Sequence, residues 1–139
     1  MISEKVRTFL KENHHAVLTT FRANGGAQMS IVLCGLYKDG VAFTTPADRA
    51  KLANLKRNQR CSLLVAQPDW WGYVVMEGQA RIMSPENTNA GELIQALRDV
   101  FVACSGSEHP NWKEYDQAVQ DERRSVVIIE PESIYSPTP

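Results

Sequence analysis

The stretch of sequence that decides the fold is residues 41–58, VAFTTPADRAKLANLKRN. Its first four residues follow an Asp-Gly turn signal and predict a strand that leaves a hairpin. Thr45 is a candidate helix cap, with Pro46 at the first helical position and Asp48 near the positive end of the helix dipole. The sequence therefore predicts a strand, a tight turn and a helix start in direct succession.

Positive charge is concentrated in the helix that follows this turn. Residues 49–60 contain five cations and no carboxylate, whereas the whole chain balances 15 Lys and Arg against 16 Asp and Glu. Helix-start amides, two threonine hydroxyls and a cluster of cations together favour an anion. We interpret the stretch as the site of a phosphate-bearing cofactor. The alternative is an ordinary solvated basic helix, because Lys and Arg are mostly exposed.

Chain length, net charge and cysteine spacing exclude several classes of protein. A chain of 139 residues predicts a single domain over residues 1–139, and its net charge of −1 argues against a general nucleic-acid or membrane-surface binder. No apolar run is long enough to span a membrane, and residues 1–20 lack the pattern of a signal peptide. The three cysteines are widely spaced and odd in number, which predicts reduced thiols in the cytoplasm and no metal site.

The rest of the chain alternates strands with helices. Helical spacing occurs over residues 2–12, from Ser84-Pro85-Glu86 to Cys104, and from Trp112 to Glu122. Strands are expected at residues 16–21, 28–37, 41–44, 61–66, 73–83 and 125–129, and residues 131–139 are expected to trail off. Six mostly antiparallel strands with flanking helices predict an α+β fold around a small closed or partly closed barrel, which removes exposed strand edges.

Several of these segments, in this order, resemble the pyridoxamine 5′-phosphate oxidase-like split β-barrel superfamily. They are AVLTT (16–20), NG (24–25), QMSIV (28–32), TT (44–45), RAKLANLKRN (49–58) and YVVMEGQA (73–80). The resemblance is greatest to the flavin/deazaflavin oxidoreductase branch, many of whose members use coenzyme F420. It implies a six-stranded antiparallel split barrel of the FMN-binding type.

The resemblance also implies site residues. In the family the cofactor phosphate lies against the turn and helix start after the third strand, which here are Thr44, Thr45, Arg49, Ala50 and Lys51. The second strand contacts the ring system, which implies roles for Gln28, Ser30, Ile31 and Val32. Members are typically homodimers with the cofactor site at the interface, so Trp70, Trp71 and Tyr73 are expected to reach a partner's site.

The function that we expect is that of an F420-dependent oxidoreductase, with hydride transfer between reduced deazaflavin and a small conjugated or heteroaromatic substrate. F420 has a tail of phosphate and several glutamates, and Lys56, Arg57 and Arg60 extend the basic track beyond the phosphate, which favours F420 over FMN. No catalytic residue is predicted, because the cofactor carries the hydride.

Two alternatives remain at this point. One is an FMN-dependent oxidoreductase of the same fold. The other is a non-catalytic flavin- or haem-binding module, for which His14, His15 or His109 would have to provide an axial ligand.

Overall fold

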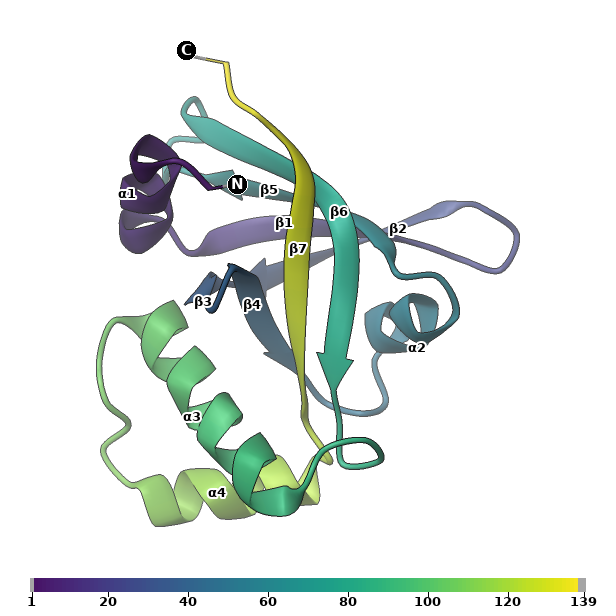
Figure 1. The fold of residues 1–139 in the computed structure, drawn as a ribbon, viewed down its shortest axis with the longest axis vertical. Helices are drawn as coiled ribbons and strands as arrows, with labels where there is room; N and C mark the ends of the chain where they lie inside the picture. The colour runs from purple at the N-terminus through teal and green to yellow at the C-terminus, as the bar shows by residue number, and fades with distance from the viewer. Residues whose placement is uncertain (1, 138–139) are drawn as a thin grey trace.

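The computed structural model describes residues 2–137 and has a single seven-stranded sheet with four helices (Figure 1). In chain order the elements are α1 (Glu4–Glu12), β1 (His15–Phe21), β2 (Ala27–Leu33), β3 (Gly35–Tyr37), β4 (Gly40–Thr45), α2 (Ala50–Arg57), β5 (Arg60–Ala66), β6 (Tyr73–Met83), α3 (Ala90–Ser105), α4 (Trp112–Asp121) and β7 (Ser125–Tyr135). Every strand pairing is antiparallel.

The connection between β2 and β3 shows why the sheet has to curl. The strand order is β2-β1-β5-β6-β7-β4-β3, so these two strands lie at opposite ends of the sheet, yet only Cys34 separates them along the chain. In a flat sheet seven strands would place the two edges roughly 29 Å apart, far beyond the reach of one residue. The sheet therefore bends into a half-barrel, in which β1 and β2 cross behind β6 and β7 in the view of Figure 1.

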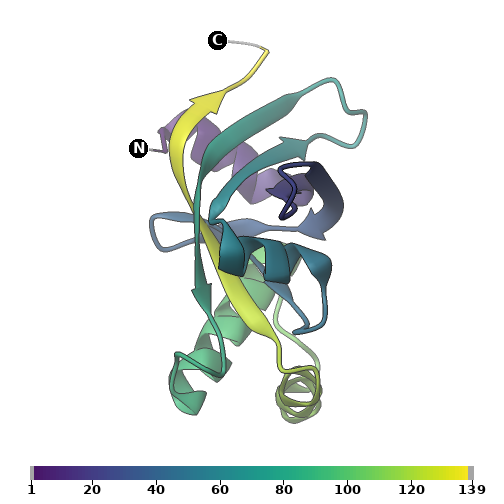
Figure 2. The same ribbon diagram turned by 90° about the vertical axis from the view of Figure 1, so that its right-hand side faces the viewer.

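Two hydrophobic cores lie on the two faces of this sheet. On β4, Val41 and Phe43 point into the barrel and Ala42 points toward α3 and α4. On β7, Val127 and Ile129 likewise belong to the barrel core, while its alternate residues pack against the helices. This period-two alternation explains why β4 and β7 are buried along most of their length. Figure 2 shows α3 and α4 together at the end of the barrel away from α1.

The predicted antiparallel barrel is confirmed, with seven strands where six were expected. The expected strand over residues 28–37 is divided at Cys34, because its first part pairs with β1 and its second part with β4. The last strand does not trail off at Pro131 but continues to Tyr135. Pro131 lies opposite Gly78, next to a bulge in which Glu132 of β7 is the extra residue, so the absent proline N–H does not end the ladder.

Two expected helix starts are wrong. Helix α2 begins at Ala50, and its N-cap Arg49 makes no side-chain capping bond. Thr45 cannot cap it because Thr45 is still paired with Ser125 in the ladder between β4 and β7, and its hydroxyl donates to the carbonyl of Pro46. Residues 46–49 therefore form a loop between strand and helix.

The second wrong start lies at Ser84. Residues 84–88 form a turn, in which Asn87 Oδ1 accepts a hydrogen bond from the backbone N–H of Ser84 at 2.8 Å. The cap of α3 is Asn89, whose side chain accepts from the backbone N–H of Glu92. Asparagine is among the residues preferred at the N-cap, and α3 begins directly after it.

Candidate cofactor site

A pocket of about 420 Å³ lies between β2 and the pair α3–α4. The ends of β2 and β4 and the first turn of α2 form one side of it, and the two helices form the other. Its lining residues are Ile31, Val32, Leu33, Thr44, Thr45, Pro46, Lys51, Val100, Phe101, Cys104, Tyr115, Ala118, Val119, Glu122 and Arg124. The pocket therefore has one polar, mainly cationic end and one apolar wall.

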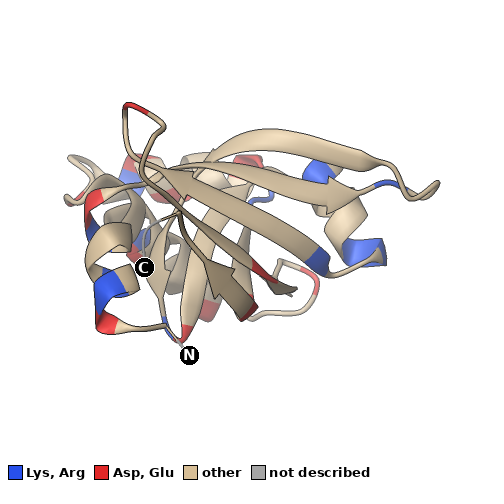
Figure 3. Ribbon diagram, turned by 90° about the horizontal axis from the view of Figure 1, so that it is seen from above, with Lys and Arg blue, Asp and Glu red and all other residues tan. Residues whose placement is uncertain are grey.

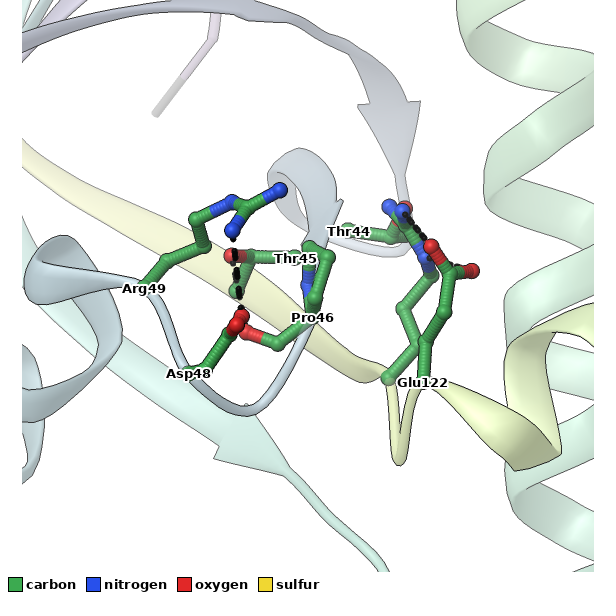
Figure 4. Close-up of polar contacts among 7 residues, drawn as sticks. Thr44, Thr45, Pro46, Asp48, Arg49 and Glu122 are labelled. Atoms are coloured by element: carbon green, nitrogen blue, oxygen red, sulfur yellow. Dashed lines mark hydrogen bonds and ion pairs between the residues drawn. The ribbon is translucent and has the colours of Figure 1, made fainter.

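The polar end is built around Arg124, at the start of β7. Its Nη1 donates to Thr44 Oγ1 at 2.8 Å, and its Nη2 and Nε donate to the Glu122 carboxylate at 3.1 and 3.3 Å. Figure 4 shows Thr44 and Glu122 on one side of this end and the loop that carries Asp48 and Arg49 on the other. The antiparallel pairing of β4 with β7 brings residues 44 and 124 together although 80 positions separate them.

Lys51 is the second cation of the polar end. Within residues 2–137 its ammonium group has no hydrogen bond or ion pair, and it is half-buried in the first turn of α2. Burial, and then the nearby charges of Arg49 and Arg124, lower the pKa of Lys51. An anion bound here would offset both effects by favouring the charged ammonium, because Lys51 is partly desolvated and has no counter-ion among the described residues.

Arg49 contributes charge from just outside the pocket. It is exposed and pairs with the neighbouring Asp48 at 3.2 Å, which is a weak surface interaction. Figure 3 shows α2 with blue segments and no red ones. The charge asymmetry that the sequence indicated is therefore preserved in space.

The apolar wall is provided by α3 and α4. Phe101 and Tyr115 meet edge-on, with ring centroids 5.2 Å apart, and Tyr115 donates its hydroxyl to the carbonyl of Leu97 at 2.9 Å. Burial raises the pKa of Tyr115 to about 12, so it stays neutral and holds the helices together. The close approach of α3 depends on Gly35, because a Cβ there would lie 2.5 Å from the carbonyl oxygen of Ala103.

The far end of α2 belongs to a different polar network. Asn54 is buried, and its Nδ2 donates to Thr20 Oγ1 at 3.1 Å, while Thr20 donates to Gln28 Oε1 at 3.0 Å. Gln28 in turn donates to Ser30 Oγ at 2.9 Å. Arg57 joins this network by donating to Asn54 Oδ1 at 3.0 Å and to the carbonyl of Phe21 at 2.8 Å. These bonds fix α2 to the hairpin of β1 and β2.

An apolar surface covers the outer side of the sheet. Met29, Ile31 and Leu33 alternate along β2 and are 66%, 73% and 51% exposed. Trp70 is also largely exposed, and together with Met29 and Tyr73 it lines a second hollow on this outer side. Trp70 and Tyr73 therefore lie outside the pocket of their own chain.

The structure thus brings together five of the twelve residues expected at the site: Ile31, Val32, Thr44, Thr45 and Lys51 line the pocket. Arg49 and Ala50 are adjacent to it, and Gln28, Ser30 and Arg57 lie in the Asn54 network. Arg124, Glu122 and the residues of the apolar wall were not predicted from the sequence as site residues. The sequence feature that could have pointed to Arg124 is the Arg-Arg pair directly before the last strand. That pair indicates a site residue only when it is known that the last strand pairs with β4.

Two of the three histidines, His14 and His109, make structural contacts, whereas His15 is exposed. Both ring nitrogens of His14 lie within hydrogen-bond distance of backbone carbonyls, those of Cys34 and Lys11. His109 packs against the rings of Phe101, Trp112 and Tyr115, and its Nδ1 accepts from the backbone N–H of Asn111. In the described part of the chain no three His, Cys, Asp or Glu side chains form a metal site, and no helix is long and apolar enough to cross a membrane.

Fold and site together define a split barrel with a pocket that has a cationic end and an apolar wall. The model of the pyridoxamine 5′-phosphate oxidase family matches residues 2–136, and the chain belongs to this family. The family binds flavins and includes oxidoreductases.

Solved structures agree with this assignment of the fold. The chain is similar to the conserved hypothetical protein Rv2991 from Mycobacterium tuberculosis, with 23% identity, a TM-score of 0.75, and coverage of 98% of this chain and 84% of that one. It is also similar to an F420 reductase, with 20% identity, a TM-score of 0.66, and coverage of 96% and 98%. General Stress Protein 26 from Bacillus anthracis matches with 16% identity, a TM-score of 0.65, and coverage of 96% and 91%.

Proposed function

We propose that this chain is an F420-dependent oxidoreductase that transfers hydride between the reduced deazaflavin and a small conjugated or heteroaromatic substrate. The observation that carries the proposal is that one pocket contains both Lys51, a partly desolvated cation with no partner among residues 2–137, and an apolar wall with Phe101 and Tyr115. A similar solved structure is that of an F420 reductase. FMN is the alternative cofactor for the same pocket.

Different residues would bind different parts of the cofactor. Lys51, Arg124 and the hydroxyl of Thr44 would hold the phosphate through charge-assisted hydrogen bonds, with Thr45, Arg49 and Ala50 around them. Arg57, at the far end of α2, would meet only the longer tail of F420.

The bound deazaflavin or flavin supplies the hydride chemistry. The protein would orient it along Ile31 and Val32 of β2, and Val100, Phe101 and Val119 would exclude water from the opposite side. The proposed reaction requires no nucleophile or general base from the protein.

We further propose that the protein acts as a homodimer with the cofactor site at the interface. Met29, Ile31 and Leu33 form an exposed apolar row on the edge strand β2, and a second chain would cover such a row. Ile31 and Leu33 also line the pocket, so a partner on this row would border the cofactor and bring its Trp70 or Tyr73 close. Light scattering should give the mass of two chains. A concentration-independent mass near 15.6 kDa would contradict the dimer.

The cofactor is tested by titrating the protein with F420 and with FMN, followed by absorbance and by native mass spectrometry. We expect saturable binding of F420 that is tighter than that of FMN. The affinity should fall with added salt, because partly exposed ion pairs are screened over about 8–10 Å at physiological ionic strength. Tighter binding of FMN would support the alternative cofactor, and no binding of either would overturn the proposed function.

A further inference from the structure

The polar end of the pocket contains a carboxylate among its cations. Glu122 accepts two hydrogen bonds from Arg124, through Nε and Nη2, while the third nitrogen of that guanidinium is bound to Thr44. Glu122 lines the pocket together with Lys51 and Arg124, so it faces the same space as the two cations. A carboxylate in the proposed binding position of a phosphate needs an explanation, because it repels the ligand that the cations attract.

Glu122 is held in this position by its backbone. Its N–H donates to the carbonyl of Ala118 at 3.0 Å, and its own carbonyl accepts from the N–H of Ala47 at 3.1 Å. The second bond ties the end of α4 to the loop between β4 and α2, directly beside the threonines. The backbone of Glu122 is therefore fixed beside the pocket, and its side chain, which is 41% exposed, is oriented by the two hydrogen bonds from Arg124.

The charges that line the pocket determine which charge on the ligand's phosphate group is bound most favourably. Lys51 and Arg124 provide two positive charges and Glu122 one negative charge, which leaves a net charge of one positive unit. A phosphodiester carries one negative charge and is matched by this sum. A phosphomonoester carries about 1.5 to 2 negative charges at pH 7, and its excess charge faces the Glu122 carboxylate.

We propose that Glu122 is a specificity-determining residue, which makes the pocket favour a singly charged phosphodiester over a phosphomonoester. This inference rests on the proposed function and deepens it, because the phosphate of F420 is a diester and that of FMN is a monoester. Arg124 would then contact two anionic groups. It attracts the phosphate of the ligand, and it also binds the Glu122 carboxylate, which repels a phosphate with more than one negative charge.

The test is the variant Glu122→Gln, which keeps the shape and the backbone bonds and removes the charge. Affinities for F420, FMN and riboflavin are measured by absorbance titration at pH 7.5. We expect FMN to bind about tenfold more tightly to the variant and F420 at most about threefold, because the relief of repulsion grows with the charge of the phosphate group that faces Glu122. Riboflavin, which has no phosphate, should bind both proteins equally.

Asp121→Asn is the matched control. Asp121 is one residue earlier and carries the same charge, but it does not line the pocket, and its carboxylate accepts a hydrogen bond from Gln117 and none from Arg124. Its variant should leave the ratio of FMN to F420 affinity unchanged. The inference is overturned if Glu122→Gln changes FMN and F420 binding equally, if riboflavin binding changes as much, or if Asp121→Asn has the same effect.

Failure of the inference is distinguishable from failure of the proposed function. If the unmodified protein binds F420 in a manner that depends on Lys51, and Glu122→Gln does not shift the ratio, only the inference falls. If the unmodified protein binds neither cofactor, the proposed function falls and the inference falls with it.

Discussion

At one end of α2, Lys51 faces the pocket and has no counter-ion in the described part of the chain; at the other end, Arg57 donates hydrogen bonds to Asn54 and to the carbonyl of Phe21. Both are basic residues of one short helix, and the sequence presents them as a single cluster of positive charge. In space the cluster is divided. The first turn supplies charge to a pocket, and the last turn fixes the helix to the hairpin of β1 and β2.

The comparison shows that charge density by itself does not identify a binding residue. What separates the two ends is whether the chain already satisfies the cation. A guanidinium that is bound to internal acceptors contributes to stability, whereas a desolvated ammonium without a partner raises the energy of the unliganded protein and is available to a ligand.

The largest effect should come from removing Lys51. In Lys51→Ala the cofactor phosphate loses a charge-assisted hydrogen bond, so affinity for FMN and for F420 should fall about tenfold or more, since about 1.4 kcal/mol is one decade. The free energy of unfolding should barely change, because Lys51 has no partner among the described residues. Absorbance titration and urea unfolding measure the two quantities. Lys113→Ala, on the exposed side of α4, is the control, and equal binding by Lys51→Ala and the unmodified protein would contradict the site.

Arg57→Ala tests the other end of α2. In this variant we expect stability to fall and FMN binding to stay the same, the reverse of Lys51→Ala. Loss of the bonds to Phe21 and Asn54 should lower the free energy of unfolding by about 1 kcal/mol. Affinity for FMN should not change, and affinity for F420 should fall only through its glutamate tail. If FMN binding fell as far as in Lys51→Ala, the division of α2 into two ends would be wrong.

The smallest effect should be a dependence of affinity on pH. Burial, followed by Arg49 and Arg124, lowers the pKa of Lys51 below its usual 10.5, and a bound phosphate favours the protonated form. Binding is therefore coupled to proton uptake, and FMN affinity should fall a few-fold as the pH rises through the alkaline range below 10.5.

The lowered pKa of Lys51 also makes the stability of the unliganded protein depend on pH. In the unliganded protein the unfolded chain binds the Lys51 proton more tightly than the folded chain, so this group makes folding slightly more favourable as the pH rises through that range. Lys51→Arg, which stays charged throughout, is the control for both measurements and should remove the Lys51 contribution to each. An identical pH profile in this variant would show that Lys51 does not titrate in the pocket.

Much of the fold was accessible from the sequence because it depends on local patterns. Alternating apolar residues defined β1, β5 and β6, and the turn residues placed most of their ends. The predicted starts of α2 and α3 failed for one shared reason. At Thr45 and at Ser84, residues with the right capping chemistry are engaged in a strand pair or a turn, and such competition is invisible until the partner is known.

The sequence by itself determined the family, the barrel and the position of the basic helix beside two threonines, since these follow from residue type and spacing over short distances. Only the tertiary structure decided which basic residues line the pocket. It paired β4 with β7 and so brought Arg124 to Thr44, and it packed α3 on Gly35 and so placed Phe101 opposite β2. The physical reason is that a binding site is made by contacts between distant segments, whereas the sequence directly encodes only the preferences of neighbouring residues.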